Sequence, residues 1–229
     1  MKKFLLVLVI LNVLILNAGT PEGDQNSIFD HLTTDAKILT DNGILKDAVD
    51  IKTFTSNFEK SSYTKVFAIE VNGNLEYEIG GIVNNSGTYT VMFLKTKAAQ
   101  DAYAIEFLTI YKNTPSELDA MAIDASRNLW MSLCNAHAAD KLVEKLYTSQ
   151  AYYYNRGRLL QGTKALTTEY SYMNMSSYAL KLTPKHVVSV TPEIVYEIGQ
   201  CSGSYPLPYM LVWQKQEDGT WQILMDSNY

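Results

Sequence analysis

Two carboxylates in this chain stand where an acid or base could work. Glu197 lies inside a strand predicted over residues 194–200, and Asp226 lies near the end of one predicted over residues 221–226. A carboxylate in an apolar cleft can serve as a general base, so these two are the candidate catalytic residues. The opposing interpretation is structural: Glu78 occupies the same place in a second Tyr-Glu-Ile-Gly string, which indicates a scaffold residue, and Asp226 could simply be a hydrogen-bonded strand end.

Aromatic residues supply the candidate walls of a pocket. A strand turns Tyr152 and Tyr154 to one face and Tyr153 to the other, so one face could line a cavity. Packing between sheet and helices is the alternative, and aromatic residues are ordinary strand formers. Arg158 could bind an anionic group of a ligand. The predicted ligand pocket comprises Trp130, Tyr152, Tyr154, Arg158, Tyr170, Tyr196 and Trp213.

Other kinds of site lack a sequence signal. His31, His137 and His186 are scattered through three unrelated elements, so no metal site is predicted. Cys134 and Cys201 have no suitably spaced His, and whether they pair stays open. No nucleophile elbow or phosphate-binding glycine loop occurs, and we predict no cofactor.

The amino terminus has the layout of a secretory signal peptide. Lys2 and Lys3 precede the apolar run of residues 4–16, and small residues follow at positions 18 and 19. An uncleaved membrane anchor is the alternative, but the run is shorter than the ~20 apolar residues of a spanning helix. We therefore expect residues 1–18 to be removed and the mature protein to be periplasmic or secreted, without a membrane contact.

Charge excludes another class of partner. Removing residues 1–18 takes Lys2 and Lys3 from the 19 Lys+Arg and none of the 24 Asp+Glu, so the net charge changes from −5 to −7. No cluster of Lys or Arg forms a basic face. A nucleic-acid partner is therefore not expected.

The second half of the chain reads as helices followed by strands. Thr114, Pro115 and Glu117 suggest a capping box for a long helix whose apolar stripe is Leu118, Met121, Ala125, Leu129, Leu133 and Ala136. Further helices are predicted over residues 138–147 and 163–172, and strands over 151–154, 186–190, 194–200, 209–215 and 221–226. Residues 217–219 form a hairpin turn. This order predicts an α+β domain in which a curved antiparallel sheet wraps helices.

The first half repeats part of this plan. Residues 77–80 match residues 196–199, and Tyr89 with Lys95 is spaced like Tyr209 with Lys215. Gly43 falls where Gly157 does, and Asp47 can cap a helix that bears Ile51, Phe54 and Phe58. We predict an internal duplication: a degenerate first repeat over residues 24–112, without the long opening helix, and a complete second repeat over residues 116–229.

Three stretches of the second half, residues 135–147, 151–166 and 195–226, carry a family resemblance. Their order and spacing resemble the SnoaL-like and ketosteroid-isomerase-like branch of the nuclear transport factor 2-like superfamily. The resemblance implies a cone-shaped sheet that encloses a pocket and tends to pair with another sheet. Two repeats in one chain could pair internally as a pseudo-dimer, and a homodimer is the alternative.

The resemblance also bears on chemistry. The position of the steroid isomerases' catalytic base is Asn155 here, and an amide is not basic. Their tyrosine donor falls near Trp130 and Met131, so steroid isomerisation is not expected. Three functions stay open: non-catalytic binding of a small apolar or amphipathic molecule, a lyase, cyclase or isomerase that uses Glu197 or Asp226, and an assembly module whose cone is filled by side chains.

Overall fold

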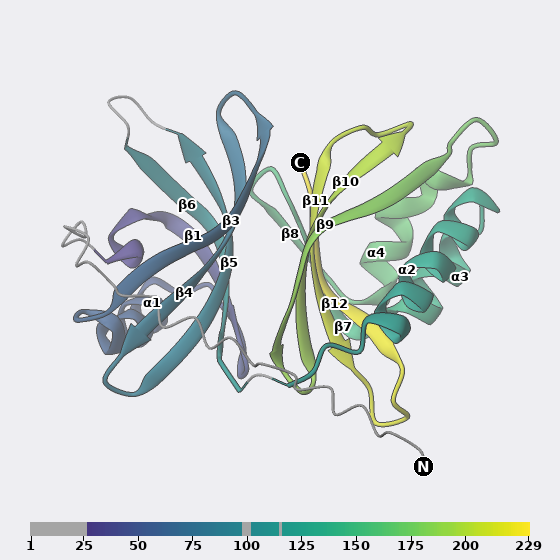
Figure 1. Ribbon diagram of the computed structural model, residues 1–229. Coiled ribbons are helices and arrows are strands. Elements are labelled where there is room, and N and C mark those ends of the chain that lie inside the picture. The colour runs from purple at the N-terminus through teal and green to yellow at the C-terminus, as the bar shows by residue number, and fades with distance from the viewer. Residues whose placement is uncertain (1–26, 98–101, 115) are drawn as a thin grey trace, which may run out of the picture.

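The computed structural model describes residues 27–97, 102–114 and 116–229, and the predicted signal peptide lies outside them. The described chain is an α+β protein with two six-stranded sheets. One sheet belongs to the first half, residues 27–112, and the other to the second half, residues 116–229. The sheets face each other in the centre of the molecule, and the helices lie on their outer sides (Figure 1).

The first half is built mainly from strands. Asp47 accepts a hydrogen bond from the backbone N–H of Val49 at 2.8 Å, which confirms the predicted helix cap. The strands are β1 (Leu32–Thr40), β2 (Gly43–Leu45), β3 (Ser62–Asn72), β4 (Leu75–Asn84), β5 (Gly87–Lys97) and β6 (Tyr103–Lys112). The helical segments are η1 (Ile28–His31), α1 (Ala48–Thr55) and η2 (Ser56–Phe58).

The second half adds three helices to the same kind of sheet. Its helical segments are α2 (Ala120–Asn135), α3 (Ala139–Leu146), α4 (Thr163–Glu169) and η4 (Tyr170–Asn174). Its strands are β7 (Tyr147–Asn155), β8 (Arg158–Gln161), β9 (Leu180–Thr191), β10 (Ile194–Gly203), β11 (Pro208–Lys215) and β12 (Trp221–Asn228).

The two sheets share one strand order. The first runs β2-β1-β6-β5-β4-β3 and the second β8-β7-β12-β11-β10-β9, so each strand has a counterpart six strands later. Gly43 and Gly157 adopt the left-handed backbone, at φ +98° and +78°, where β1 turns to β2 and β7 to β8. This order fits two copies of one plan.

The sheets are mixed, so the prediction of antiparallel sheets was wrong. Strand β1 runs parallel to β6, and β7 runs parallel to β12, while the other neighbouring pairs are antiparallel. In each half the first strand along the chain therefore lies beside the last one, β1 beside β6 and β7 beside β12. A parallel neighbour that is remote in sequence leaves no hairpin signal, and for that reason the pattern of turns did not reveal it.

Strand register corrects one predicted equivalence. Gly80 of β4 lies opposite Val91, and Gly199 of β10 lies opposite Tyr209. The counterpart of Tyr209 is therefore Val91 rather than Tyr89. Likewise Glu76 lies opposite Lys95 and Val195 opposite Trp213, so Lys95 corresponds to Trp213 rather than to Lys215.

Helix α2 begins later, and turns a different face inward, than the sequence predicted. Asp119, rather than Thr114, caps it by accepting a hydrogen bond from Ala122 N–H at 3.3 Å. Its buried residues are Ile123, Arg127, Trp130 and Cys134, whereas Met121 is 86% exposed and Leu129 40% exposed. The purely apolar stripe was misleading because the buried arc contains an ion-paired arginine.

Each sheet has an apolar core on its outer face. Helices α2, α3 and α4 cover the second sheet, and their core includes Leu142, Leu146, Leu166 and Ile223. In the first half the segments η1, α1 and η2 cover a smaller area around Phe58, Phe93 and Ile105. The prediction that the first repeat lacks the long opening helix concerns in part residues 24–26, which lie outside the described residues.

A third core joins the two halves. The inner faces meet along a set of buried apolar residues that includes Tyr77, Ile79, Met92, Tyr196, Met210 and Met225. Tyr77 and Ser227 share a hydrogen bond at 3.1 Å between their hydroxyls, and Thr109 and Tyr196 share one at 3.0 Å. The sheets therefore pack as in a sandwich, with polar contacts between the halves as well as apolar ones.

Replacing Gly199 by Ala should destabilise the fold. The new Cβ would lie 2.2 Å from Tyr209 Cζ, and the buried Tyr209 cannot rotate away without losing its hydrogen bond to Glu197. We expect a loss of about 2–4 kcal/mol in the free energy of unfolding, measured by urea denaturation. Gly73→Ala is the control, since nothing lies within 4 Å of its Cβ position. Equal losses in the two variants would contradict the explanation.

Candidate functional site

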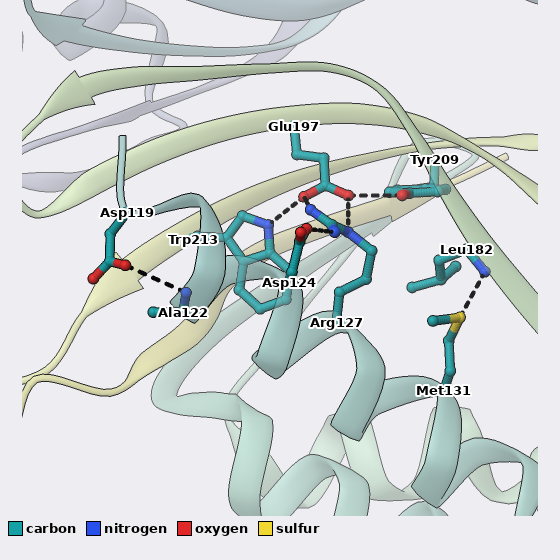
Figure 2. A network of polar contacts seen from close by, with 9 residues as sticks. All are labelled: Asp119, Ala122, Asp124, Arg127, Met131, Leu182, Glu197, Tyr209 and Trp213. Atoms are coloured by element: carbon teal, nitrogen blue, oxygen red, sulfur yellow. Dashed lines mark hydrogen bonds and ion pairs between the residues drawn. The ribbon is translucent and has the colours of Figure 1, made fainter. Parts of the chain in front are cut away.

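Glu197 is the centre of a buried polar network that ties α2 to the second sheet (Figure 2). Its side chain is fully buried. Arg127 of α2 donates from Nε to Oε1 and from Nη2 to Oε2, both at 2.8 Å. Tyr209 OH donates to Oε1 at 2.7 Å, and Trp213 Nε1 donates to Oε2 at 2.8 Å.

This arrangement leaves Glu197 little capacity for catalysis. Each carboxylate oxygen already accepts two hydrogen bonds from protein donors, and the paired guanidinium stabilises the ionised form. A base needs a lone pair directed at the substrate's proton. The geometry therefore favours the scaffold interpretation for Glu197.

Glu78 of the first half has a comparable network with a different cation. Tyr63 OH donates to Glu78, and Lys95 Nζ contacts both Glu78 and Glu76, the latter at 2.8 Å. A Cβ at Gly80 would meet the Tyr63 ring, just as one at Gly199 would meet Tyr209. In both halves the glycine two positions after the glutamate makes room for the tyrosine that donates to it.

Asp226 is the one candidate whose environment is unusual for a carboxylate. It is 4% exposed, and its Oδ2 accepts hydrogen bonds from Tyr147 OH at 2.7 Å and from Tyr170 OH. Burial raises the pKa of Asp226 to about 6, although the two phenol hydrogen bonds act to lower it. Trp130 Nε1 donates to Tyr147 OH at 3.1 Å and extends the network.

The space beside Asp226 is small. A cavity of about 10 Å³ is lined by Asp226 together with Trp130, Leu180, Leu182, Cys201, Tyr209, Leu211 and Asn228. That volume is of the order of one water molecule. Between the sheet and its helices, the second half is thus filled by side chains at this point.

A larger depression opens at the end of the second half, and we call it the mouth pocket. Its volume is about 510 Å³, and Asn228 lines both it and the small cavity. The lining residues are Tyr153, Asn155, Arg156, Glu169, Tyr172, Met175, Ser177, Tyr178, Ser204, Tyr205 and Asn228. Asn155, which the sequence resemblance places at the position of the steroid isomerases' base, lines this pocket.

The structure distributes the seven predicted pocket residues over several places. Trp130 lines the small cavity, and Tyr170 bonds to Asp226 behind it. Trp213 is buried against Glu197. None of these three lines the mouth pocket.

The other four predicted pocket residues line neither the small cavity nor the mouth pocket. Tyr154 and Tyr196 are buried between the sheets, where Tyr154 OH donates to Glu106 Oε2 at 3.1 Å. Tyr152 shares their face, as strand alternation predicted, and lines a groove between the halves. Arg158 is 60% exposed and pairs with Glu169 at 2.6 Å.

Sequence reasoning missed Arg127 and the aromatic residues of the mouth. Arg127 was hidden because a charged residue was not expected on a buried helix face; its spacing from Ile123 and Trp130 was the available signal. Tyr172, Tyr178 and Tyr205 lie in η4 and in loops, where no periodicity marks which side chains converge.

The two cysteines are the remaining candidate nucleophiles, and burial disfavours their reactive thiolate form. Cys134 and Cys201 are free and buried, and burial raises the pKa of Cys134 to about 11.

The described part of the chain holds no group of three or more His, Cys, Asp or Glu side chains placed to bind a metal ion. Within residues 27–97, 102–114 and 116–229, no helix is long and apolar enough to cross a membrane.

Comparison with known proteins returns structural matches only. No protein-family model matches the chain, and no curated protein matches it. Among solved structures, an NTF-2-like protein of unknown function from Shewanella oneidensis MR-1 is 18% identical, with 48% of this chain and 98% of that one covered at a TM-score of 0.42. A ketosteroid isomerase-like protein from Erwinia carotovora atroseptica is 14% identical, with 49% and 95% covered at a TM-score of 0.41.

A domain of unknown function with a cystatin-like fold from Nostoc punctiforme is 17% identical, with 49% of this chain and 77% of that one covered at a TM-score of 0.41. Each of these matches covers about half of the chain, and none describes an activity for this protein.

The Arg127–Glu197 pair should be strongly coupled in stability. Arg127→Met leaves a buried carboxylate without its cation, so we expect a loss of about 3–5 kcal/mol in the free energy of unfolding. The double variant Arg127→Met/Glu197→Met should lose less than the sum of the two single losses, as measured by a double-mutant cycle in urea.

Asp124→Asn is the control for this cycle. Asp124 also pairs with Arg127 but is 63% exposed, so its loss should be below about 1 kcal/mol. Additive losses in the cycle would mean that Glu197 and Arg127 do not act as a unit.

Proposed function

We propose that the protein binds a small amphipathic molecule in the mouth pocket of its second half, without catalysis. The observation that carries this proposal is the pocket itself. Its volume of about 510 Å³ falls in the range of small-molecule sites, and residues of β7, α4, η4, β12 and the loops beside them line it.

Aromatic surface supports an apolar or aromatic ligand body. Tyr172 and Tyr178 meet edge to face, with ring centroids 5.3 Å apart, and Tyr172 is 36% exposed. Met175, 54% exposed, adds an adaptable apolar side chain. Such surfaces bind flat apolar groups while their hydroxyls remain available as donors.

Charge at the rim favours a ligand with an anionic end. Arg156 lines the pocket, and its guanidinium carbon lies 5.6 Å from the centre of the Tyr229 ring. Glu169, the acid of the pocket, is already paired with Arg158 at 2.6 Å. Arg156 is therefore the group that would meet a carboxylate, in place of the predicted Arg158.

The resemblance to nuclear transport factor 2-like proteins supports this assignment. We propose that the second sheet and its three helices form the cone of that fold, with the mouth pocket at its open end. The two halves would then be tandem repeats that pair as a pseudo-dimer within one chain. The layout of residues 1–18 supports export of this protein.

Binding of 2-naphthoate, a flat aromatic carboxylate, tests the proposal. We expect saturable binding, followed by fluorescence or NMR, that Arg156→Gln weakens about two- to fivefold because one exposed ion pair is lost. Tyr172→Ala should weaken it further by removing aromatic surface.

Lys164→Gln is the matched control, since this exposed cation of α4 does not line the mouth pocket. It should leave the affinity within about twofold of the parent. The proposal fails if naphthoate does not bind, or if Lys164→Gln and Arg156→Gln have equal effects.

Acid–base catalysis at Asp226 is the second candidate function. It is supported by the raised pKa of about 6 and by the contact of Asp226 with a cavity. It ranks second because the cavity of about 10 Å³ admits no substrate unless the lining at Asn228 opens.

Titration of Asp226 should appear in the pH dependence of stability. Because its folded pKa of about 6 exceeds the ordinary 3.8, its contribution to stability is present below pH 3.8 and is lost as the pH rises through about 6. Asp226→Asn cannot titrate, so its stability relative to the parent should rise by up to about 3 kcal/mol between pH 4 and 7. Parallel urea-unfolding curves against pH would contradict the raised pKa and remove the second candidate.

A further inference from the structure

A second recess, distinct from the mouth pocket, lies where the two halves meet. We call it the seam groove; its volume is about 550 Å³, and it shares no lining residue with the mouth pocket. It is lined by Leu39, Thr40, Asp41, Gly43, Tyr111 and Thr114 from the first half and the linker, and by Gln150, Tyr152, Thr191, Glu193, Ile194, Gln214 and Leu224 from the second.

One largely buried tyrosine lines this groove, and its hydroxyl has no hydrogen-bond partner among the described residues. Tyr111 is 8% exposed, and its ring packs edge to face on Tyr196 at 6.3 Å. Among the residues that the structure describes, no side chain or backbone group hydrogen-bonds to its hydroxyl. The hydroxyl oxygen itself is not fully buried, so it is open to the groove. Its neighbour Tyr152, by contrast, accepts a hydrogen bond from Gln161 Nε2 at 3.3 Å. A hydroxyl held in this way is available to a ligand.

The charge of the groove has one sign. Asp41 and Glu193 are exposed carboxylates on its two sides, one from each half, and no Lys, Arg or His is among its lining residues in the described chain. The field of Asp41 reaches Tyr111, where it adds to burial in raising the pKa of that phenol. A cation near Tyr111 would therefore be stabilised by Asp41, and Glu193 adds a second carboxylate to the lining of the same groove.

The floor of the groove is apolar. Leu39, Ile194 and Leu224 are 1%, 4% and 8% exposed and carry no polar side-chain atom. A ligand that fills the groove thus meets hydrocarbon below and negative charge at the rim. Tyrosine faces also attract cations, which adds to the preference.

From these contacts we infer that the seam groove is a binding site for a protonated amine with an apolar chain. The ammonium group donates hydrogen bonds to the Asp41 carboxylate and to the Tyr111 hydroxyl oxygen, and Glu193 adds charge from the other half. The chain of the amine packs on Leu39, Ile194 and Leu224. The site is complete only when both halves are paired.

Titration of the ¹⁵N-labelled full chain with hexylammonium chloride at pH 7, followed by NMR, tests this site. Shifts should map to the groove, at Tyr111, Tyr152 and Ile194, and should weaken with added salt. Neutral 1-hexanol should bind at least about fivefold more weakly than hexylammonium, and hexanoate more weakly still, because only the ammonium pairs with the carboxylates.

Three isosteric variants separate the contributions. Asp41→Asn and Glu193→Gln should each weaken hexylammonium binding about two- to fivefold and leave 1-hexanol unaffected. Tyr111→Phe should weaken it about two- to tenfold, since only a hydroxyl is removed. Glu144→Gln, an exposed acid of α3 that does not line the groove, is the control and should match the parent.

The results decide the matter in either direction. Shifts confined to the seam groove that respond to Asp41→Asn and Tyr111→Phe, but not to Glu144→Gln, support the site. The inference is overturned if hexanol binds as well as hexylammonium, if the shifts map elsewhere, or if no shifts occur up to millimolar amine. None of these readouts depends on the mouth pocket, so failure here and failure of naphthoate binding are distinguishable.

Discussion

The packing of one sheet's inner face against the other is the interaction on which the rest of the structure depends. A sheet with helices on one side still has a second face to bury, and in this chain each half covers the other's. The shared core places the Tyr77 hydroxyl of the first half on Ser227 of the second, and the Tyr196 hydroxyl of the second on Thr109 of the first. Neither half would keep these tyrosines dry and hydrogen-bonded without its neighbour.

On the outer faces of the two sheets, a buried glutamate is neutralised in two different ways. On its outer face each sheet carries a buried glutamate, Glu78 or Glu197, whose burial requires a cation and a phenol. In the second half the cation comes from α2, because the strand position that could supply it holds Trp213. In the first half the corresponding strand residue is Lys95, so the carboxylate is neutralised within the sheet. The second half thus has Trp213 where the first has Lys95, and its helix α2 supplies the cation, Arg127, instead.

Sequence reasoning reached the elements more readily than their contacts. The hairpins, the Asp47 cap and the alternation of Tyr152 with Tyr153 follow from local rules, and the structure has them. The parallel β1–β6 and β7–β12 pairs join residues far apart in the chain, so turns and periodicity carried no sign of them. The residues of the candidate site were harder to predict from the sequence than the helices and strands. Which face of β7 meets a cavity, and whether Arg127 is buried, are decided by the partner surface rather than by spacing along the chain.

Because the two halves belong to one chain, their sequences need not be identical. In a dimer of identical subunits every residue occurs twice, so a carboxylate placed on one side of the interface is repeated on the other. Here Asp41 and Glu193 come from different sequence contexts and border the same groove, while Tyr154 and Glu106 form a hydrogen bond elsewhere between the halves. The core beside Asp226 holds only about 10 Å³ of space, and the larger recesses lie where packing ends: the mouth pocket of the second half and the seam groove between the two halves. Their rims hold exposed residues such as Asp41, Glu193 and Arg156, which substitution can change without disturbing either core.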